Sequence, residues 1–187
     1  MVLQHSPLGT VADISQEFRS AFRLQASTVA LITYWNEVGQ ASGMTVTSLT
    51  SLSSDPPSLL VCLHRETRTF VSVCESGSFG VDLLQLGQKQ IAQHCSRPGG
   101  SKVLAEEWLA ESDGSFSPVL AGSLAHFDCS VVRWHEEFTH GLVVGRIDHV
   151  VLGGEGKSPL IYSGGFYNRV ASELDELDRQ HWQLGIG

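Results

Sequence analysis

Charged side chains are scarce in this sequence, and positive ones are the scarcer of the two signs. Only 17% of the 187 residues are charged, and 12 Lys and Arg stand against 20 Asp and Glu, which gives a formal net charge of −8. No stretch concentrates Lys and Arg beyond a pair or two. Nucleic acid and anionic membrane surfaces are therefore not expected as partners.

Cysteines are few, and long apolar runs are absent. The four cysteines, Cys62, Cys74, Cys95 and Cys129, form no C-x-x-C pair, which indicates free thiols in a reducing compartment. No apolar run approaches the roughly 20 residues of a membrane-spanning helix. The N-terminus lacks the basic and apolar regions of a secretion signal. These absences predict a cytoplasmic protein with no membrane partner.

Familiar nucleotide and hydrolase motifs are also missing. There is no G-x-G-x-x-G for a dinucleotide-binding fold and no G-x-S-x-G for a nucleophile elbow. Gly156-Lys157-Ser158 resembles the end of a phosphate-binding loop, but the first glycine of that motif would fall on Val151. Pro159 follows where a helix should begin. We therefore expect no nucleoside-triphosphate site.

Two groups of residues invite a metal interpretation, and neither supports one. His135 and His140 are five residues apart in a predicted strand, so they face opposite sides. Cys62 and His64 could share a strand face, but no third ligand is identifiable. The sequence predicts no metal site.

What is present favours one mainly β domain with short helices. Hydrophobic residues make up 42% of the chain and glycine occurs 19 times, which suits short strands and tight turns. We expect a single domain over residues 1–187, with a loose arm at 1–12 and a helical tail from about 168 to 187. Five or more strands without β-α-β alternation favour a closed or nearly closed antiparallel barrel.

The expected elements follow from polarity periods and from Gly and Pro breakers. Helices are predicted at about 13–24, 67–75, 87–95, 102–109 and 172–180. Strands are predicted at about 28–35, 41–48, 58–64, 79–84, 125–138, 141–152 and 159–162. The first two strands should form a hairpin, and the strands at 125–138 and 141–152 should form an antiparallel ribbon.

The most informative stretch runs from Gly43 to Thr69. It gathers serines and threonines ahead of the Pro56-Pro57 corner, continues as an apolar strand, and then adds two arginines and two threonines. Hydroxyls, amides and guanidinium groups suit an anionic, amide-rich ligand. The same residue types are common on the exposed face of an edge strand, where they satisfy local backbone groups. From composition alone both interpretations stay open.

The order of residues resembles one known family. The resemblance rests on Gly43-Met44-Thr45-Val46-Thr47-Ser48, Asp55-Pro56-Pro57, Cys62-Leu63 with Arg65, Thr67 and Thr69, Phe79–Leu84, His140–Ile147, and Pro159–Tyr162 with Gly165 and Tyr167. In order and spacing, from about Phe18 to Tyr167, these are similar to the flavin reductase-like family. Its members are small NAD(P)H:flavin oxidoreductases that serve two-component monooxygenases. Three positions differ from the family pattern. Thr47 stands where the family usually has Asn or Ser, and Asp82 stands where it usually has Asn. Phe138-Thr139-His140 stands where members that bind NADH typically have Gly-Asp-His.

The resemblance implies a fold, cofactors and partners. The fold would be a homodimeric, Greek-key-like FMN-binding split β-barrel, with a flavin cleft completed by the second subunit. NADH or NADPH would transfer a hydride to N5 of FMN or FAD, and the reduced flavin would leave for a partner monooxygenase. That transfer needs no side-chain acid, base or nucleophile, which agrees with the absence of a catalytic motif.

The resemblance also implies site residues. The flavin ring would lie along the segment from Thr45 to Ser48, and the phosphate would be held by Ser51 or Ser53 together with the arginines and threonines at 65–69. His140 is the candidate nicotinamide contact. The complete set of implied cofactor contacts is Met44, Thr45, Val46, Thr47, Ser48, Ser51, Ser53, Cys62, Leu63, Arg65, Thr67, Arg68, Thr69, Asp82, Tyr162, Phe166 and Tyr167.

Two other functions stay open on the same barrel. One is a non-enzymatic module that binds flavin or haem as a sensor or carrier. The other is a reductase that retains FMN and passes electrons to a metal or corrinoid acceptor.

Overall fold

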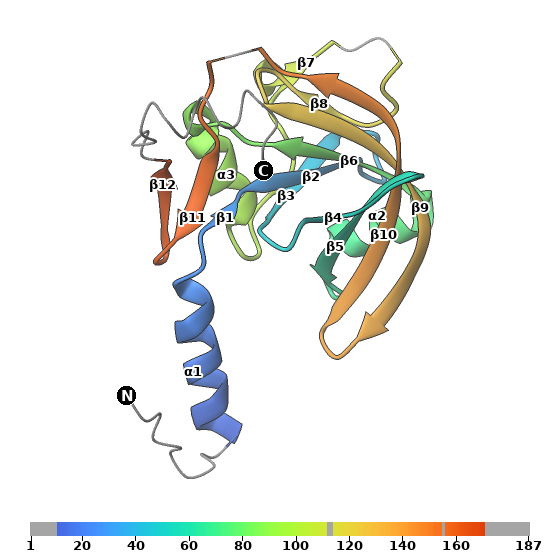
Figure 1. Cartoon of the computed structure of the whole chain (residues 1–187). Helices are drawn as coiled ribbons and strands as arrows, with labels where there is room; N and C mark the ends of the chain where they lie inside the picture. The colour runs from blue at the N-terminus through green and yellow to red at the C-terminus, as the bar shows by residue number, and fades with distance from the viewer. Residues whose placement is uncertain (1–10, 112–113, 155, 171–187) are drawn as a thin grey trace.

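The computed structural model describes residues 11–111, 114–154 and 156–170 (Figure 1). Its helices are α1 (Val11–Arg23), α2 (Arg68–Ser76) and α3 (Lys89–Ser96), with short 3₁₀ turns η1 (Leu86–Gln88) and η2 (Glu106–Trp108). Its strands are β1 (Ser27–Thr28), β2 (Ala30–Trp35), β3 (Ala41–Val46), β4 (Thr50–Ser54), β5 (Pro57–His64), β6 (Ser78–Leu83), β7 (Leu109–Ala110), β8 (Val119–Leu120), β9 (Ala125–Glu137), β10 (His140–Leu152), β11 (Leu160–Ser163) and β12 (Phe166–Arg169).

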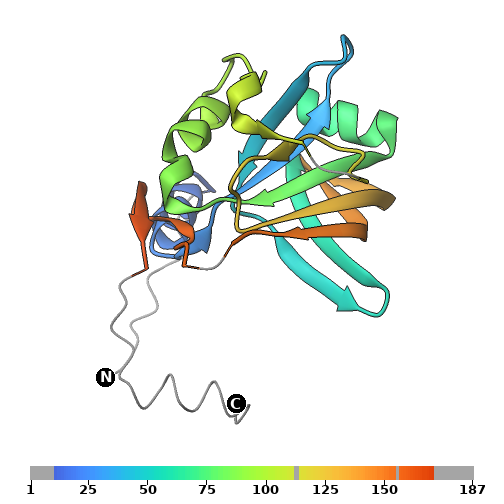
Figure 2. The same ribbon diagram turned by 90° about the horizontal axis from the view of Figure 1, so that it is seen from above.

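Seven strands form the main sheet, in the order β3-β2-β6-β9-β10-β5-β4, and every neighbouring pair is antiparallel. Its two edge strands, β3 and β4, follow one another in the chain. The sheet therefore curls so that its edges approach (Figures 1 and 2). This confirms the predicted mainly β, antiparallel, barrel-like fold.

The hollow of the curled sheet holds the first hydrophobic core. Buried residues from both ends of the sheet meet there, including Ile32 from β2, Val61 and Leu63 from β5, and Val143 from β10. Phe70 and Val73 of α2 close this core from one side. Burial of such side chains is worth about 1.5–3 kcal/mol each, so this core holds α2 against the sheet.

A second core lies on the opposite face of β2 and β3. Leu31 and Ala41 pack there against Ile91, Ala92 and other residues around α3. A separate three-stranded sheet, in the order β1-β11-β12, stands beside this core (Figure 1). Leu160 of β11 contributes to the same cluster and is fully buried.

Most of the predicted elements are present within a few residues, including the 28–35/41–48 hairpin and the long ribbon of β9 and β10. The predicted helix at 102–109 is wrong. Only η2 is helical there, because the backbone of the preceding residues pairs with β3: Val103 bridges Ser42 and the Leu104 amide donates to the Ala41 carbonyl. Tertiary pairing overrides the local periodicity.

Strand β4 and strand β12 were not predicted. The serines and threonines of β4 form an edge strand that pairs with β5 through the Asp55-Pro56 turn. Strand β12 pairs with β11 and occupies the first residues of the expected C-terminal tail. The predicted helix at 172–180 and most of the predicted arm at 1–12 lie outside the described residues. No helix in the described ranges is long and apolar enough to cross a membrane.

Candidate functional site

The first turn of α2 presents backbone donors. Thr67 is the N-cap: its hydroxyl oxygen accepts from the Phe70 amide at 3.2 Å and its proton goes to the His64 carbonyl at 2.7 Å. The amides of Arg68 and Thr69 make no hydrogen bond within the described part of the chain. Free N–H groups and the helix dipole together favour an anion at this position.

The side chains of the same turn suit the same ligand. Arg68 is exposed and carries a guanidinium group beside the free amides. Thr69 is only 1% exposed, yet its hydroxyl has no hydrogen-bond partner in the described ranges. This hydroxyl is therefore free to donate to an acceptor bound at the same turn.

These residues open into a cavity of about 810 Å³, which we call the helix-end cavity. One wall is the α2 turn with Thr67, Arg68 and Thr69. Facing walls come from Met44 on β3, from the β2–β3 hairpin and from the loop before η2. The remaining lining residues are Tyr34, Asn36, Glu37, Val38, Gln40, Ser42, Glu66, Ser72, Gly99, Gly100, Ser101, Lys102 and Val103.

Lys102 is the second cation of the helix-end cavity. Its Nζ lies 2.6 Å from the Cys95 carbonyl oxygen and 2.8 Å from that of Arg97. Burial lowers the pKa of this ammonium from its ordinary value. An ammonium has three donors, so two carbonyls leave one donor for another acceptor.

Two other predicted contacts, Thr47 and Ser51, line a different cavity of about 440 Å³. We call it the hydroxyl cavity. Its walls come from residues 25–28, from the β3–β4 connection and from the start of β5, with Leu83, Phe127 and Ile147 at its apolar side. The predicted cofactor stretch thus faces two cavities and not one continuous cradle.

Ser48 and Cys62 link the β3–β4 connection to β5 by hydrogen bonds. The Ser48 hydroxyl donates to the Cys62 carbonyl at 2.8 Å and accepts from the Cys62 amide at 3.3 Å. This exchange fixes the β3–β4 connection against β5. Thr47 and Ser48 are exposed and Thr45 is half-buried, so the side chains of these three residues in the predicted ring-binding segment are accessible at the surface of the single chain.

Several predicted contacts are placed elsewhere. Val46 and Leu63 are 7% and 0% exposed and pack in the first core, so their side chains cannot reach a ligand. The Ser53 hydroxyl closes the β4–β5 turn through the backbone of Asp55. Arg65 points to the far end of the ribbon, where its guanidinium lies 3.5 Å from the exposed carboxylate of Glu136.

His140 and the three predicted aromatic contacts also lie outside both cavities. His140 pairs with His64 across β10 and β5, and their rings are 5.2 Å apart at an angle of 69°. Tyr162, Phe166 and Tyr167 are on β11 and β12, where the two tyrosine rings contact each other at 5.5 Å. Phe166 is 73% exposed and Tyr167 packs at the second core.

Asp82 is the clearest correction. It is fully buried on β6 and makes polar contacts with His126 of β9 and Leu120 of β8. Its Oδ2 lies 3.1 Å from Nδ1 of His126, and its Oδ1 accepts from the Leu120 amide at 3.2 Å. A fully buried carboxylate with both oxygens engaged is not available to a flavin.

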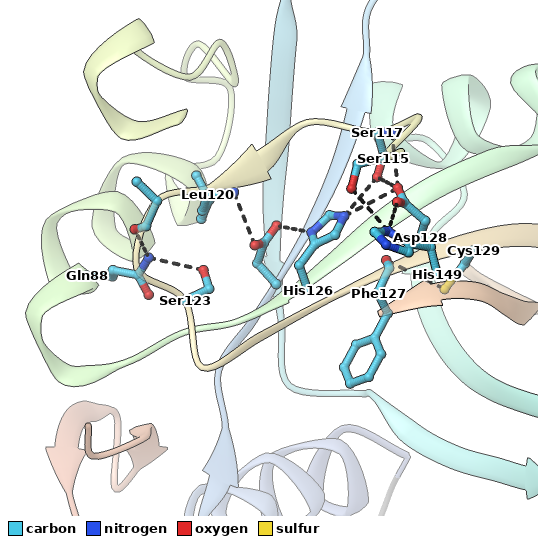
Figure 3. Close-up of polar contacts among 12 residues, drawn as sticks. Gln88, Ser115, Ser117, Leu120, Ser123, His126, Phe127, Asp128, Cys129 and His149 are labelled. Carbon is cyan, nitrogen blue, oxygen red and sulfur yellow. Dashed lines mark hydrogen bonds and ion pairs between the residues drawn. The ribbon is translucent and has the colours of Figure 1, made fainter. Parts of the chain in front are cut away.

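The network continues beyond His126. The other ring nitrogen, Nε2, lies 3.3 Å from Oδ1 of Asp128 and 3.2 Å from the Ser117 hydroxyl. Asp128 also accepts from the amide and hydroxyl of Ser117 and contacts the half-exposed His149 (Figure 3). Sequence reasoning missed His126 and Asp128, and the one signal for them was Asp82 in the place of the family's Asn.

The network controls the charge of His126. Burial alone would lower the pKa of this imidazole, but hydrogen bonds and charge from Asp82 and Asp128 outweigh burial and raise it. Burial pushes the pKa of Asp128 up, and the hydrogen bonds from Ser117 and its neighbours reverse this, so the net pKa is lowered. Burial raises the pKa of Asp82, and its hydrogen bonds with His126 and the Leu120 amide oppose that rise.

Ser117, His126 and Asp82 have the residue types of a hydrolase triad, but not its chemistry. The Ser117 hydroxyl donates to Asp128, and both nitrogens of His126 face carboxylates, so the imidazole cannot accept the serine proton. Ser117 is also only 6% exposed. The network is structural. No group of three potential metal ligands is found among the described residues.

The comparisons with known proteins agree with this architecture. The family model described as "Flavin reductase like domain" matches residues 22–171. The chain belongs to the flavin reductase-like family. A relative in that family, "Flavin reductase (NADPH)" of Lentzea aerocolonigenes, is 37% identical over 147 residues, which cover 78% of this chain and 84% of the relative.

Other flavin reductase-like relatives extend the comparison. A protein of Rhizobium meliloti (strain 1021) named "Probable flavin reductase" is 32% identical over 149 residues, covering 80% of this chain. The match spans only 47% of that relative's length. The solved styrene monooxygenase flavin reductase of Pseudomonas putida S12 superposes with a TM-score of 0.75 at 30% identity, covering 84% of this chain and 99% of the other.

Proposed function

We propose that this chain uses NADH or NADPH to reduce FMN or FAD and supplies the reduced flavin to a partner monooxygenase. The observation that carries the proposal is the first turn of α2. Two free amides, the Arg68 guanidinium and the unpartnered Thr69 hydroxyl meet there at one end of the helix-end cavity. This donor set fits a phosphate ester, and it lies within the segment that resembles the family's flavin site.

The residues present also fit the rest of a flavin. The open segment from Thr45 to Ser48 offers backbone amides and hydroxyls for a heterocycle with amide-like edges. Cys62 lies beside it through the Ser48 bonds. We assign Met44, Thr45, Thr47, Ser48, Cys62, Thr67, Arg68 and Thr69 as candidate flavin contacts and leave out the buried Val46, Leu63 and Asp82. When bound, the flavin supplies the hydride acceptor.

The chain's own residues bind and orient the two cofactors. The α2 turn would fix the phosphate, and the rigid Ser48–Cys62 clamp would hold the ring-binding segment in place. Precise positioning of two reactants is itself a large source of rate acceleration. No side chain in this region has to act as a base or nucleophile.

A homodimer is part of the proposal. Helix α1 projects from the body of the chain (Figure 1), and its apolar side chains Ile14, Phe18 and Phe22 are 53%, 58% and 58% exposed. An apolar helix stripe of this kind is normally covered by another surface. A second copy of the chain would cover it and could also cover the open segment from Thr45 to Ser48.

The test is steady-state oxidation of NADH and NADPH by the purified chain, with FMN, with FAD and without flavin. Flavin-dependent turnover is expected with at least one of the four pairs. The absence of turnover with every pair would contradict the proposal. Flavin that stays bound through purification without turnover would indicate a binding module.

A further inference from the structure

The helix-end cavity continues well past the group that would hold the flavin phosphate. Beyond the α2 turn it is walled by the β2–β3 hairpin at residues 36–40 and by the loop at residues 99–103. Its volume of about 810 Å³ lies near the top of the usual range of about 300–1,000 Å³ for ligand pockets. Resting on the proposed function, we infer that this outer part of the cavity binds the adenylate half of FAD, so that the chain prefers FAD to FMN.

The first step of the argument is where a mononucleotide would end. The candidate ring contacts lie at the β3–β4 connection and Cys62, and the phosphate donors lie at Arg68 and Thr69. These two regions are joined by the end of β5. A flavin mononucleotide ends at its phosphate and would leave the hairpin and the loop without a ligand. A dinucleotide continues from that phosphate into the outer part of the cavity.

The second step is the chemistry of the outer part. Lys102 has one ammonium donor beyond the two that its neighbouring carbonyls accept, which suits the second phosphate of a pyrophosphate. The Gln40 side chain lines the cavity, and its amide nitrogen donates no hydrogen bond within the described residues. An amide of this kind can pair with the edge of an adenine.

The third step concerns charge. The carboxylates of Glu37 and Glu66 line the same cavity as the two cations. Carboxylates accept hydrogen bonds from ribose hydroxyls and from an exocyclic amino group, but they repel additional phosphates. The lining therefore fits a nucleoside attached through one pyrophosphate better than it fits a more highly phosphorylated ligand.

The experiment is a pair of equilibrium titrations of the purified chain with FMN and with FAD, followed by flavin fluorescence. FAD is expected to bind at least tenfold more tightly than FMN. Two variants test whether the preference for FAD arises in the outer part of the cavity. Gln40→Ala removes the side-chain amide, and Ser101→Trp fills space beside Lys102. Both should weaken FAD binding severalfold or more and leave FMN binding unchanged.

Matched controls separate this effect from general disturbance. Gln93→Ala and Ser96→Trp make the same changes on exposed positions of α3 that line none of the cavities described here. They should leave both flavin affinities unchanged, and thermal unfolding checks that every variant folds. Equal affinity for FMN and FAD, or equal weakening of both by Ser101→Trp, would overturn the inference while leaving flavin reduction intact. If neither flavin binds, the proposed function fails as well.

Discussion

His126 and Asp82 form a buried pair, with Nδ1 of the imidazole 3.1 Å from Oδ2 of the carboxylate and neither side chain more than 1% exposed. The pair links β9 to β6, and Asp82 also accepts a hydrogen bond from the Leu120 amide of β8. A neutral Asn at position 82 would lack the negative charge that helps to raise the pKa of His126.

This pair predicts how stability depends on pH. Because the folded state raises the pKa of His126, its contribution to the free energy of unfolding is complete below the unfolded pKa of about 6.5. The contribution is lost as the pH rises through the higher, folded pKa. The chain should thus lose stability above about pH 6.5, with a slope of at most about 1.4 kcal/mol per pH unit from this group.

Asp82→Asn tests the assignment. The amide oxygen can still accept from Leu120, but it no longer raises the pKa of His126, so the fall in stability above about pH 6.5 should become shallower. Denaturant unfolding of both proteins across this pH range measures the slope. Asp148→Asn, which removes an exposed partner of Arg146, is the matched control and should keep the wild-type slope in this range. Identical slopes for Asp82→Asn and wild type would contradict the prediction.

Gly141 gives a second prediction, because Phe70 occupies the space next to its α-carbon. A Cβ at position 141 would lie 2.0 Å from Cε2 and 2.5 Å from Cζ of this ring, which is only 5% exposed. Gly141→Ala should lower the free energy of unfolding by about 1–3 kcal/mol through overpacking. It should also weaken flavin binding, since Phe70 lies in the first turn of α2.

Gly154→Ala is the comparison for Gly141→Ala. A Cβ at position 154 meets nothing within 4 Å, so the stability should change by less than about 0.5 kcal/mol. Denaturant unfolding and a flavin titration are measured on both variants. Equal effects at the two positions would show that the close approach of Phe70 does not determine the cost.

The sequence predicted the fold best where local pattern and tertiary structure agree. The long β9–β10 ribbon is rich in Val and alternates in polarity, and both strands form as expected. The segment at 102–109 has a helical pattern of apolar residues, but Leu104 pairs through its backbone with β3. No local signal reveals such pairing, because the partner strand lies some 60 residues away in the chain, from position 41 to position 104.

The site divides in the same way. Thr67–Thr69 were proposed as phosphate contacts through the family resemblance, and the helix predicted to begin at 67 does begin there, with Thr67 as its N-cap. Asp82 could not be placed, because its partner His126 is 44 residues distant and the identity of a buried neighbour depends on strand register. The sequence also did not show that Thr47 and Ser51 line one cavity while Thr67 and Thr69 line another, because this depends on the path of the β3–β4 connection.

The apolar stripe of α1 predicts an oligomer. Phe18 and Phe22 have ring centroids 4.5 Å apart and are both mainly exposed in the single chain. If a second copy covers them, Phe18→Glu should shift the dimer toward monomer, because a carboxylate is costly to bury without a partner. Gln16→Glu, on the opposite side of α1, should leave the mass unchanged. Sedimentation velocity measures both, and a Phe18→Glu protein with the wild-type mass would contradict this interface.

The two arginines of the predicted phosphate site should now behave differently. Arg68 lies at the α2 turn in the helix-end cavity, whereas Arg65 contacts an exposed carboxylate at the ribbon. Arg68→Ala should weaken flavin binding by about 1.5–3 kcal/mol, the usual worth of a hydrogen bond to a charged group, which is roughly tenfold to a hundredfold in Kd. Arg65→Ala should change it little, because exposed ion pairs contribute about 0–1 kcal/mol and this one does not face the cavity. Titration of both variants with FMN and FAD decides between them, and a larger loss for Arg65→Ala would move the phosphate away from α2.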